Sequence, residues 1–182
     1  QTRPLEPIYA FLYMDIMRFK VDAQDSLDKK AISVSGINMY GQIEVLGIWV
    51  TENFDNDFWL TVFKDLKTRG IQDILIACKY GMSDFSVALK QVFPLTDVQI
   101  CVINNIRKSL CNVPWNDQKK IITDLKKIYL SQDSVDAIDS FQVLKANLSE
   151  RYPYVIQVWD EKWEDLFSYF KYPYEIRNIF YI

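Results

Sequence analysis

The sequence predicts an α/β protein in which a mixed β-sheet is followed by a helical extension. Alternating apolar residues mark strands near the start of the chain, and short continuous apolar runs mark buried strands further on. Apolar residues at three- and four-residue spacings mark helices between and after these strands. Of the 182 residues 49% are hydrophobic, which is enough for one core and a smaller attached lobe.

The first three strands are predicted to form an antiparallel meander. They are expected at residues 8–21, 31–38 and 42–51. A polar loop at 22–30 joins the first two, and a short turn at Gly41 joins the second to the third.

A helix and two buried strands come next. Phe58, Val62 and Leu66 recur at helical spacing in a segment that ends at Gly70. DILIACK (73–79) and VQICVI (98–103) are almost continuously apolar, as expected for strands that are buried on both faces. A short helix that stops before Pro94 connects them.

From Ile106 to Phe170 the chain is almost entirely helical in pattern, with breaks at Pro114 and Pro153. An aromatic stripe in this region is interpreted as packing rather than as a surface for stacking bases. It consists of Trp159, Trp163, Phe167 and Phe170. Together these patterns predict a sheet-containing core at 1–112 and a helical insertion or extension at 113–182.

Composition excludes several classes of function. The net charge of −3 gives no global sign of a nucleic-acid partner, so any DNA contact must come from local basic clusters. No apolar run approaches the roughly 20 residues of a membrane span, and no leader is recognised, so a cytoplasmic protein without a membrane partner is expected. The chain contains no histidine, which excludes Ser-His-Asp and Cys-His catalysis and histidine-based zinc sites.

Asp15 is the most informative single residue, because it stands within the apolar first strand IYAFLYMDIMRFKV. An unpaired buried charge costs several kcal/mol, so this carboxylate is expected to open on a cleft, to be paired, or to bind a metal ion. The alternative is an outward-facing Asp on a half-exposed strand.

The predicted order of a three-strand meander, helix, strand, helix and strand is the layout of the ribonuclease H-like fold. In that fold carboxylates at strand ends hold two divalent ions, and Asp15 would be the first of them. Several segments, in order, resemble the catalytic region of bacterial insertion-sequence transposases of the Mutator type. They include RPLEPIY (3–9), EVLGIWVTEN (44–53), LKTRGIQDILIAC (66–78), CVINNIRKSL (101–110) and YPYEIR (172–177).

The resemblance, which covers essentially the whole chain, implies an Asp-Asp-Glu triad that binds Mg²⁺ or Mn²⁺, an all-helical insertion before the Glu, and assembled dimers on DNA transposon ends. Asp15 matches the first Asp, whereas Tyr80 stands in place of the second. Asn104 stands in place of the histidine of a Cys-x-x-His motif that begins at Cys101, and the chain stops at Ile182 before the expected Glu. A phenol is neutral near pH 7 and a weak ligand for Mg²⁺, so the resemblance implies a catalytic-domain fragment that is inactive as written.

Two basic pairs are candidate phosphate contacts, although solvated surface charges explain them equally well. Arg18 and Lys20 lie on one face of the first strand, and Arg107 and Lys108 follow the last strand. Three functions stay open: an inactive transposase fragment, a repurposed DNA- or protein-binding module, and a nuclease whose rearranged metal site uses Asp15 and Asp84.

Overall fold

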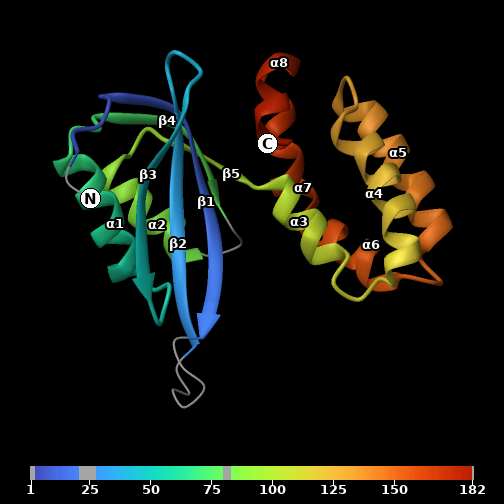
Figure 1. Ribbon diagram of the computed structural model, residues 1–182. Helices are drawn as coiled ribbons and strands as arrows, with labels where there is room; N and C mark the ends of the chain where they lie inside the picture. Colours follow the sequence, from blue (N-terminus) through green and yellow to red (C-terminus); the bar gives the residue numbers. More distant parts are fainter. Residues whose placement is uncertain (1–2, 21–27, 80–82, 182) are drawn as a thin grey trace. The chain divides into compact units, whose positions relative to one another are not determined.

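The computed structural model describes residues 3–20, 28–79 and 83–181, which belong to two compact units (Figure 1). The first unit, Gln1–Val98, contains most of the β-sheet and two helices, and the second unit, Gln99–Ile182, is built from helices. No helix in the described ranges is long and apolar enough to cross a membrane.

The sheet has five strands in the order β3-β2-β1-β4-β5. Strands β1 (Ile8–Lys20), β2 (Asp28–Asn38) and β3 (Ile43–Thr51) pair as an antiparallel meander. Strand β4 (Asp73–Lys79) pairs with β1 in parallel, and β5 (Asp97–Ile100) lies beside β4. This mixed sheet with its central parallel pair has the ribonuclease H-like strand order, so the predicted fold class is confirmed.

Two strand bounds differ from the prediction by more than one residue. Strand β2 begins at Asp28, inside the segment predicted as a loop, because β1 and β2 stay paired as far as Lys20 opposite Asp28. Strand β5 ends at Ile100 instead of residue 103, and helix α3 (Val102–Ser109) begins two residues later. The buried residues of α3 are spaced by three and four positions, which is a helical rather than a strand period.

Helices α1 (Asn56–Thr68) and α2 (Ser83–Val92) cover one face of the sheet (Figure 1). The side chain of Asp55 caps α1 by accepting a hydrogen bond from the backbone N–H of Phe58 at 2.9 Å. The core beneath the helices contains a cluster of rings: the centroid of Trp59 lies 5.9 Å from that of Phe63 and 5.1 Å from that of Phe85. All three side chains are fully buried, so this cluster joins both helices to the core.

The second unit contains six helices with two 3-10 turns among the described residues. The helices are α3, α4 (Trp115–Tyr129), α5 (Ser134–Leu148), α6 (Pro153–Asp160), α7 (Trp163–Phe167) and α8 (Tyr174–Arg177), and the 3-10 turns are Ser168–Lys171 and Asn178–Tyr181. Both prolines predicted as breaks stand at helix starts, where a missing N–H costs nothing. Helix α3 belongs to this unit, whereas the sequence predicted it to be part of the core at 1–112. It contacts α6, where the indole N–H of Trp159 donates to the buried Ser109 hydroxyl at 2.9 Å.

The aromatic stripe packs within the second unit. Trp159 is buried, and the ring of Trp163 stacks on Phe141 of α5 with centroids 4.3 Å apart. Phe167 lies 3.7 Å from Trp163 by the same measure. The stripe is divided between α6, α7 and a 3-10 turn, and its packing agrees with the interpretation made from the sequence.

Arg177 ties α8 to the turn between α4 and α5. It is only 4% exposed, and its guanidinium donates to the backbone oxygens of Ser131 at 3.1 Å and Gln132 at 2.6 Å. The guanidinium carbon also lies 4.7 Å from the centroid of the Phe170 ring and 5.3 Å from that of Tyr174. Arg177, the last residue of the segment YPYEIR, therefore stabilises the fold of the second unit.

Replacing this arginine is expected to destabilise the second unit. Arg177→Met removes two charge-assisted hydrogen bonds to partly buried backbone oxygens, and we expect the free energy of unfolding to fall by about 2–3 kcal/mol in a urea titration. Lys171→Met is the matched control, since Lys171 is an exposed cation 5.1 Å from the Tyr172 ring centroid. The control is expected to change stability by less than about 0.5 kcal/mol. Equal losses in the two variants would contradict the stabilising role of the hydrogen bonds that Arg177 donates.

Candidate active site on the sheet

Asp15 lies on β1, and its side chain is exposed. The residues before and after it in the strand, Met14 and Ile16, pack against the core that α1 and α2 cover. Because successive side chains of a strand point to opposite faces, the carboxylate stands on the face of the sheet away from this core. The structure therefore matches the outward-facing alternative, in which the carboxylate keeps its hydration.

The neighbours of Asp15 on this face come from the adjacent strands. Asp15 is opposite Ser33 on β2, which in turn is opposite Ile48 on β3. Ser33 is half-buried, and Ile48 is 47% exposed. Asp15 forms no ion pair with any residue whose side chain the structure describes.

Asp15 also lies near the carboxyl end of the parallel β1–β4 pair. In the ladder between these strands Leu12 is opposite Ala77, three residues before Asp15. Ligands of open α/β sheets bind at the carboxyl ends of parallel strands, and Asp15 is placed at such an end. Tyr80, the residue predicted to replace the second acid, lies outside the described residues.

The residues predicted on α3 form a small polar group in the second unit. Arg107 donates to the side-chain oxygen of Asn104 at 3.4 Å. Arg107 and Lys108 are exposed in the last turn of α3, where positive charge also complements the helix dipole. Their position fits either a phosphate contact or a stabilised helix end.

The other predicted contacts are described only in part. Arg18 and Lys20 lie on β1 opposite Lys30 and Asp28 of β2, and their side chains are outside the described part of the structure. Within the described ranges, no three acidic or cysteine side chains lie close enough together to hold a metal ion. Of the predicted site residues, the structure brings Asn104 and Arg107 together.

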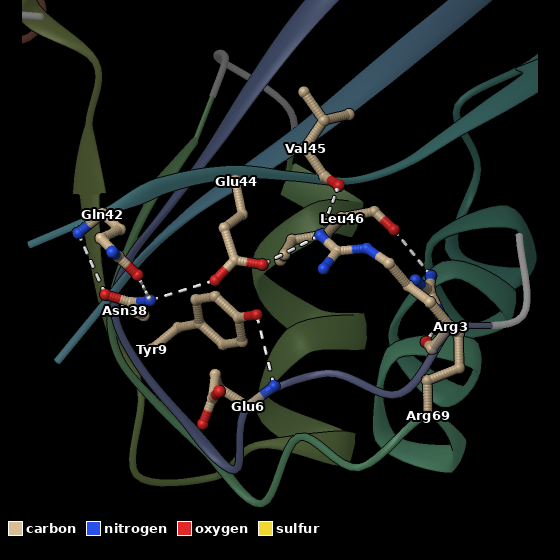
Figure 2. A network of polar contacts seen from close by, with 9 residues as sticks. All are labelled: Arg3, Glu6, Tyr9, Asn38, Gln42, Glu44, Val45, Leu46 and Arg69. Atoms are coloured by element: carbon tan, nitrogen blue, oxygen red, sulfur yellow. Dashed lines mark hydrogen bonds and ion pairs between the residues drawn. The ribbon is translucent and has the colours of Figure 1, made fainter. Parts of the chain in front are cut away.

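A polar network at the amino end of β1 was missed by the site predictions (Figure 2). The carboxylate of Glu44 on β3 accepts from Arg3 at 2.9 Å and from the side-chain amide of Asn38 at 3.0 Å. The same amide donates to Gln42 at 3.1 Å, so the network spans the β2–β3 turn. The sequence signal was available, since Arg3 and Glu44 lie in segments that resemble the transposases.

Arg69 anchors this network to α1 (Figure 2). Its side chain is 7% exposed, and it donates to the backbone oxygens of Leu46 at 2.7 Å and Arg3 at 3.2 Å. The backbone oxygen of Arg69 accepts from the N–H of Leu5 at 2.8 Å. Arg69 therefore holds together β3, the end of α1 and the segment that precedes β1.

Tyr9 closes the network from inside the core. Its ring is fully buried, and its hydroxyl accepts from the backbone N–H of Glu6 at 3.4 Å. Burial raises the pKa of this phenol above its ordinary value, and the nearby Glu44 carboxylate acts in the same direction. Tyr9 is six residues before Asp15, about 20 Å along an extended strand, so the network supports the sheet at a distance from the candidate site.

The strand order and the central parallel pair of the sheet define the class of protein, which is ribonuclease H-like. The family model described as "Transposase, Mutator family" matches residues 1–182. The chain belongs to the Mutator family of transposases.

Relatives from several bacteria match along the chain. It is 34% identical over 183 residues to a probable transposase for insertion sequence element ISRM3-like of Sinorhizobium fredii, and 34% identical to the transposase for insertion sequence element ISRM3 of Rhizobium meliloti. A probable transposase of Corynebacterium diphtheriae is 29% identical over 185 residues. Each match covers 100% of this chain, but only 46%, 46% and 53% of those proteins, so the chain spans about half the length of these relatives.

A structure of the HTLV-2 integrase catalytic core domain in complex with magnesium overlaps with 71% of this chain and 90% of that chain. The TM-score is 0.32 and the sequence identity 13%. The fold assignment therefore depends on the strand order of this chain and not on the overlap.

Replacing the anchor of the network is expected to destabilise the first unit. Arg69→Met leaves the Leu46 and Arg3 carbonyls without a charged donor, so we expect the free energy of unfolding to fall by about 2–3 kcal/mol in urea. Lys64→Met, at an exposed position on α1, is the control and is expected to be within about 0.5 kcal/mol of the parent. A stable Arg69→Met variant would show that the network does not support the sheet.

Proposed function

We propose that this chain is the catalytic region of a DNA transposase in which Asp15 is the first metal-binding carboxylate. The observation that carries the proposal is the exposed Asp15 carboxylate at the carboxyl end of the β1–β4 pair, in a chain that belongs to the Mutator family. DNA transposon ends are the proposed substrate, and a second copy of the chain is the proposed partner. Mg²⁺ or Mn²⁺ is the proposed cofactor, because hard cations prefer carboxylate oxygens.

The residues of this chain do not fit a complete two-metal site. Such a site, when loaded, activates the attacking oxygen and stabilises the leaving oxygen of a phosphodiester. In the sequence, Tyr80 stands at the position that matches the second carboxylate of the family. A phenol is neutral near pH 7 and is a weak ligand for Mg²⁺. We therefore propose that Asp15 binds a single divalent ion weakly and that this chain does not cleave DNA.

A binding module without nuclease chemistry is the second candidate. The observation that favours it is the exposed pair Arg107 and Lys108, since phosphate contacts require accessible cations and no catalytic carboxylate. The two candidates differ in whether a divalent ion binds at Asp15.

Restoring a carboxylate at position 80 is expected to improve metal binding. In a calorimetric titration with Mn²⁺, Tyr80→Asp should bind at least about tenfold more tightly than the parent chain, because a second carboxylate adds charge and ligands. Asp15→Asn should remove this gain when combined with Tyr80→Asp. Glu52→Gln, a change to an exposed acid elsewhere in the first unit, is the control and should leave the titration unchanged.

Two results would contradict the proposal. The first is Mn²⁺ binding that is the same in the parent chain, Asp15→Asn and Tyr80→Asp, which would remove Asp15 as a ligand and favour the binding module. The second is tight binding by the parent chain that is lost equally in Asp15→Asn and Asp84→Asn, because it would indicate the rearranged nuclease site. Asp84 is half-buried in the first turn of α2.

A further inference from the structure

Trp115, the first residue of α4, is exposed in a way that the fold does not explain. It is 84% exposed, whereas Trp59 and Trp159 are buried and Trp49 and Trp163 are half-buried. All five tryptophans of the chain lie in the described ranges, so Trp115 is the single exposed one. Its indole ring is therefore accessible to a ligand, and the groups around it decide whether the surface suits one.

The surface around Trp115 is a shallow depression along α4 of about 410 Å³. It is lined by Trp115, Gln118, Lys119, Ile122, Thr123 and Lys126. Trp115, Lys119, Ile122 and Lys126 follow one another at spacings of four, three and four residues, so they form one stripe on the helix. The buried residues of α4, among them Ile121 and Leu125, form a separate stripe that packs in the second unit.

The depression carries positive charge that the described residues do not neutralise. Neither Lys119 nor Lys126 forms an ion pair within the described part of the chain, and both are exposed. The two aspartates of α4 point to other partners: Asp117 accepts from Arg151 at 2.8 Å, and Asp124 accepts from Lys127 at 2.7 Å. The side of α4 that carries Lys119 and Lys126 therefore attracts an anionic ligand.

The backbone next to Trp115 is held in place. The side-chain amide of Gln118 donates to the backbone oxygen of Val113 at 2.8 Å, and the backbone oxygen of Pro114 accepts from the N–H of Asp117 at 2.9 Å. Thr123 donates its hydroxyl to the backbone oxygen of Lys119 at 2.9 Å. The polar groups of Gln118 and Thr123 are used in these contacts. A ligand in the depression can therefore bind to the indole ring of Trp115 and to the ammonium groups of Lys119 and Lys126.

We propose that this depression binds single-stranded DNA. Trp115 stacks on an unpaired base, and Lys119 and Lys126, about 10 Å apart along the helix, hold phosphates of the same strand. A flat aromatic face with two cations further along the same side of the helix suits an unpaired base and the phosphates of its strand. The bases of a duplex are already stacked on one another. The inference rests on the proposed function in taking DNA as the partner, and it adds a strand-binding site on α4 that is independent of Asp15.

The test is the affinity of the chain for a fluorescein-labelled dT12 oligonucleotide, measured by anisotropy in EDTA. Trp115→Ala should weaken binding about tenfold, while Trp115→Phe should keep most of it, because phenylalanine retains a ring. Lys119→Gln/Lys126→Gln should also weaken binding and lower the slope of log K against log salt by about 1.4, which corresponds to two lost phosphate contacts. Both sites are exposed, so the variants should keep the thermal stability of the parent chain.

Matched controls separate this site from general charge attraction. Lys64→Gln/Lys90→Gln removes the same charge from exposed positions on α1 and α2 and should change the affinity for dT12 much less. The affinity for a 12-base-pair duplex should fall in the lysine double variant. It should not change in Trp115→Ala, because a paired base cannot stack on the indole.

Three results would overturn the proposal. They are dT12 binding that is unchanged in Trp115→Ala, equal losses in the α4 and control lysine variants, and a change of oligomeric state in Trp115→Ala, since the last would make the depression a contact between copies of the chain. Because the assay contains no divalent ion, a failed metal site at Asp15 does not affect its outcome. A chain that binds dT12 without binding Mn²⁺ would count against the proposed function alone.

Discussion

Burial of one face of the sheet beneath α1 and α2 is the constraint on which the first unit depends. Leu12 and Met14 fill this core together with the ring cluster of Trp59, Phe63 and Phe85. Because strand side chains alternate with a period of two, the register that buries Met14 also turns Asp15 to the opposite face. A slip of one residue would bury the carboxylate and expose the core, so the same packing stabilises the fold and keeps Asp15 accessible.

The segments that resemble the transposases contain many residues that stabilise the fold. Arg69 donates to the carbonyls of Leu46 and Arg3, and Arg177 donates to those of Ser131 and Gln132. In both cases a nearly buried guanidinium satisfies backbone oxygens of residues far from it in the chain, which is a task that a fork of several N–H donors performs well. A family motif can therefore mark a folding requirement, and its charged residues need not belong to the site of the reaction.

The tryptophans of the second unit show that residue type alone does not decide a role. Trp159 is buried and bonded to Ser109, and Trp163 stacks on Phe141, so both contribute to packing. Trp115 begins a helix whose buried stripe lies elsewhere, and its ring remains in solvent on the same side of α4 as Lys119 and Lys126. The apolar pattern of the sequence predicted that Trp159 and Trp163 pack in the interior. The exposure of Trp115 depends on which side of α4 packs against other helices, and only the tertiary structure shows this.

The sequence by itself determined the order of strands and helices and the ribonuclease H-like fold class, because the periods of apolar residues and the turn residues are local properties. The family was indicated by segments of the sequence that resemble the transposases. The sequence also singled out Asp15. Only the tertiary structure decided that the side chain of Asp15 faces away from the core, that β5 ends at Ile100 and α3 begins at Val102, and that Arg3, Glu44 and Arg69 meet in one network. These facts depend on contacts between residues far apart in the chain, such as the 66 positions between Arg3 and Arg69, and such contacts leave no period in the sequence.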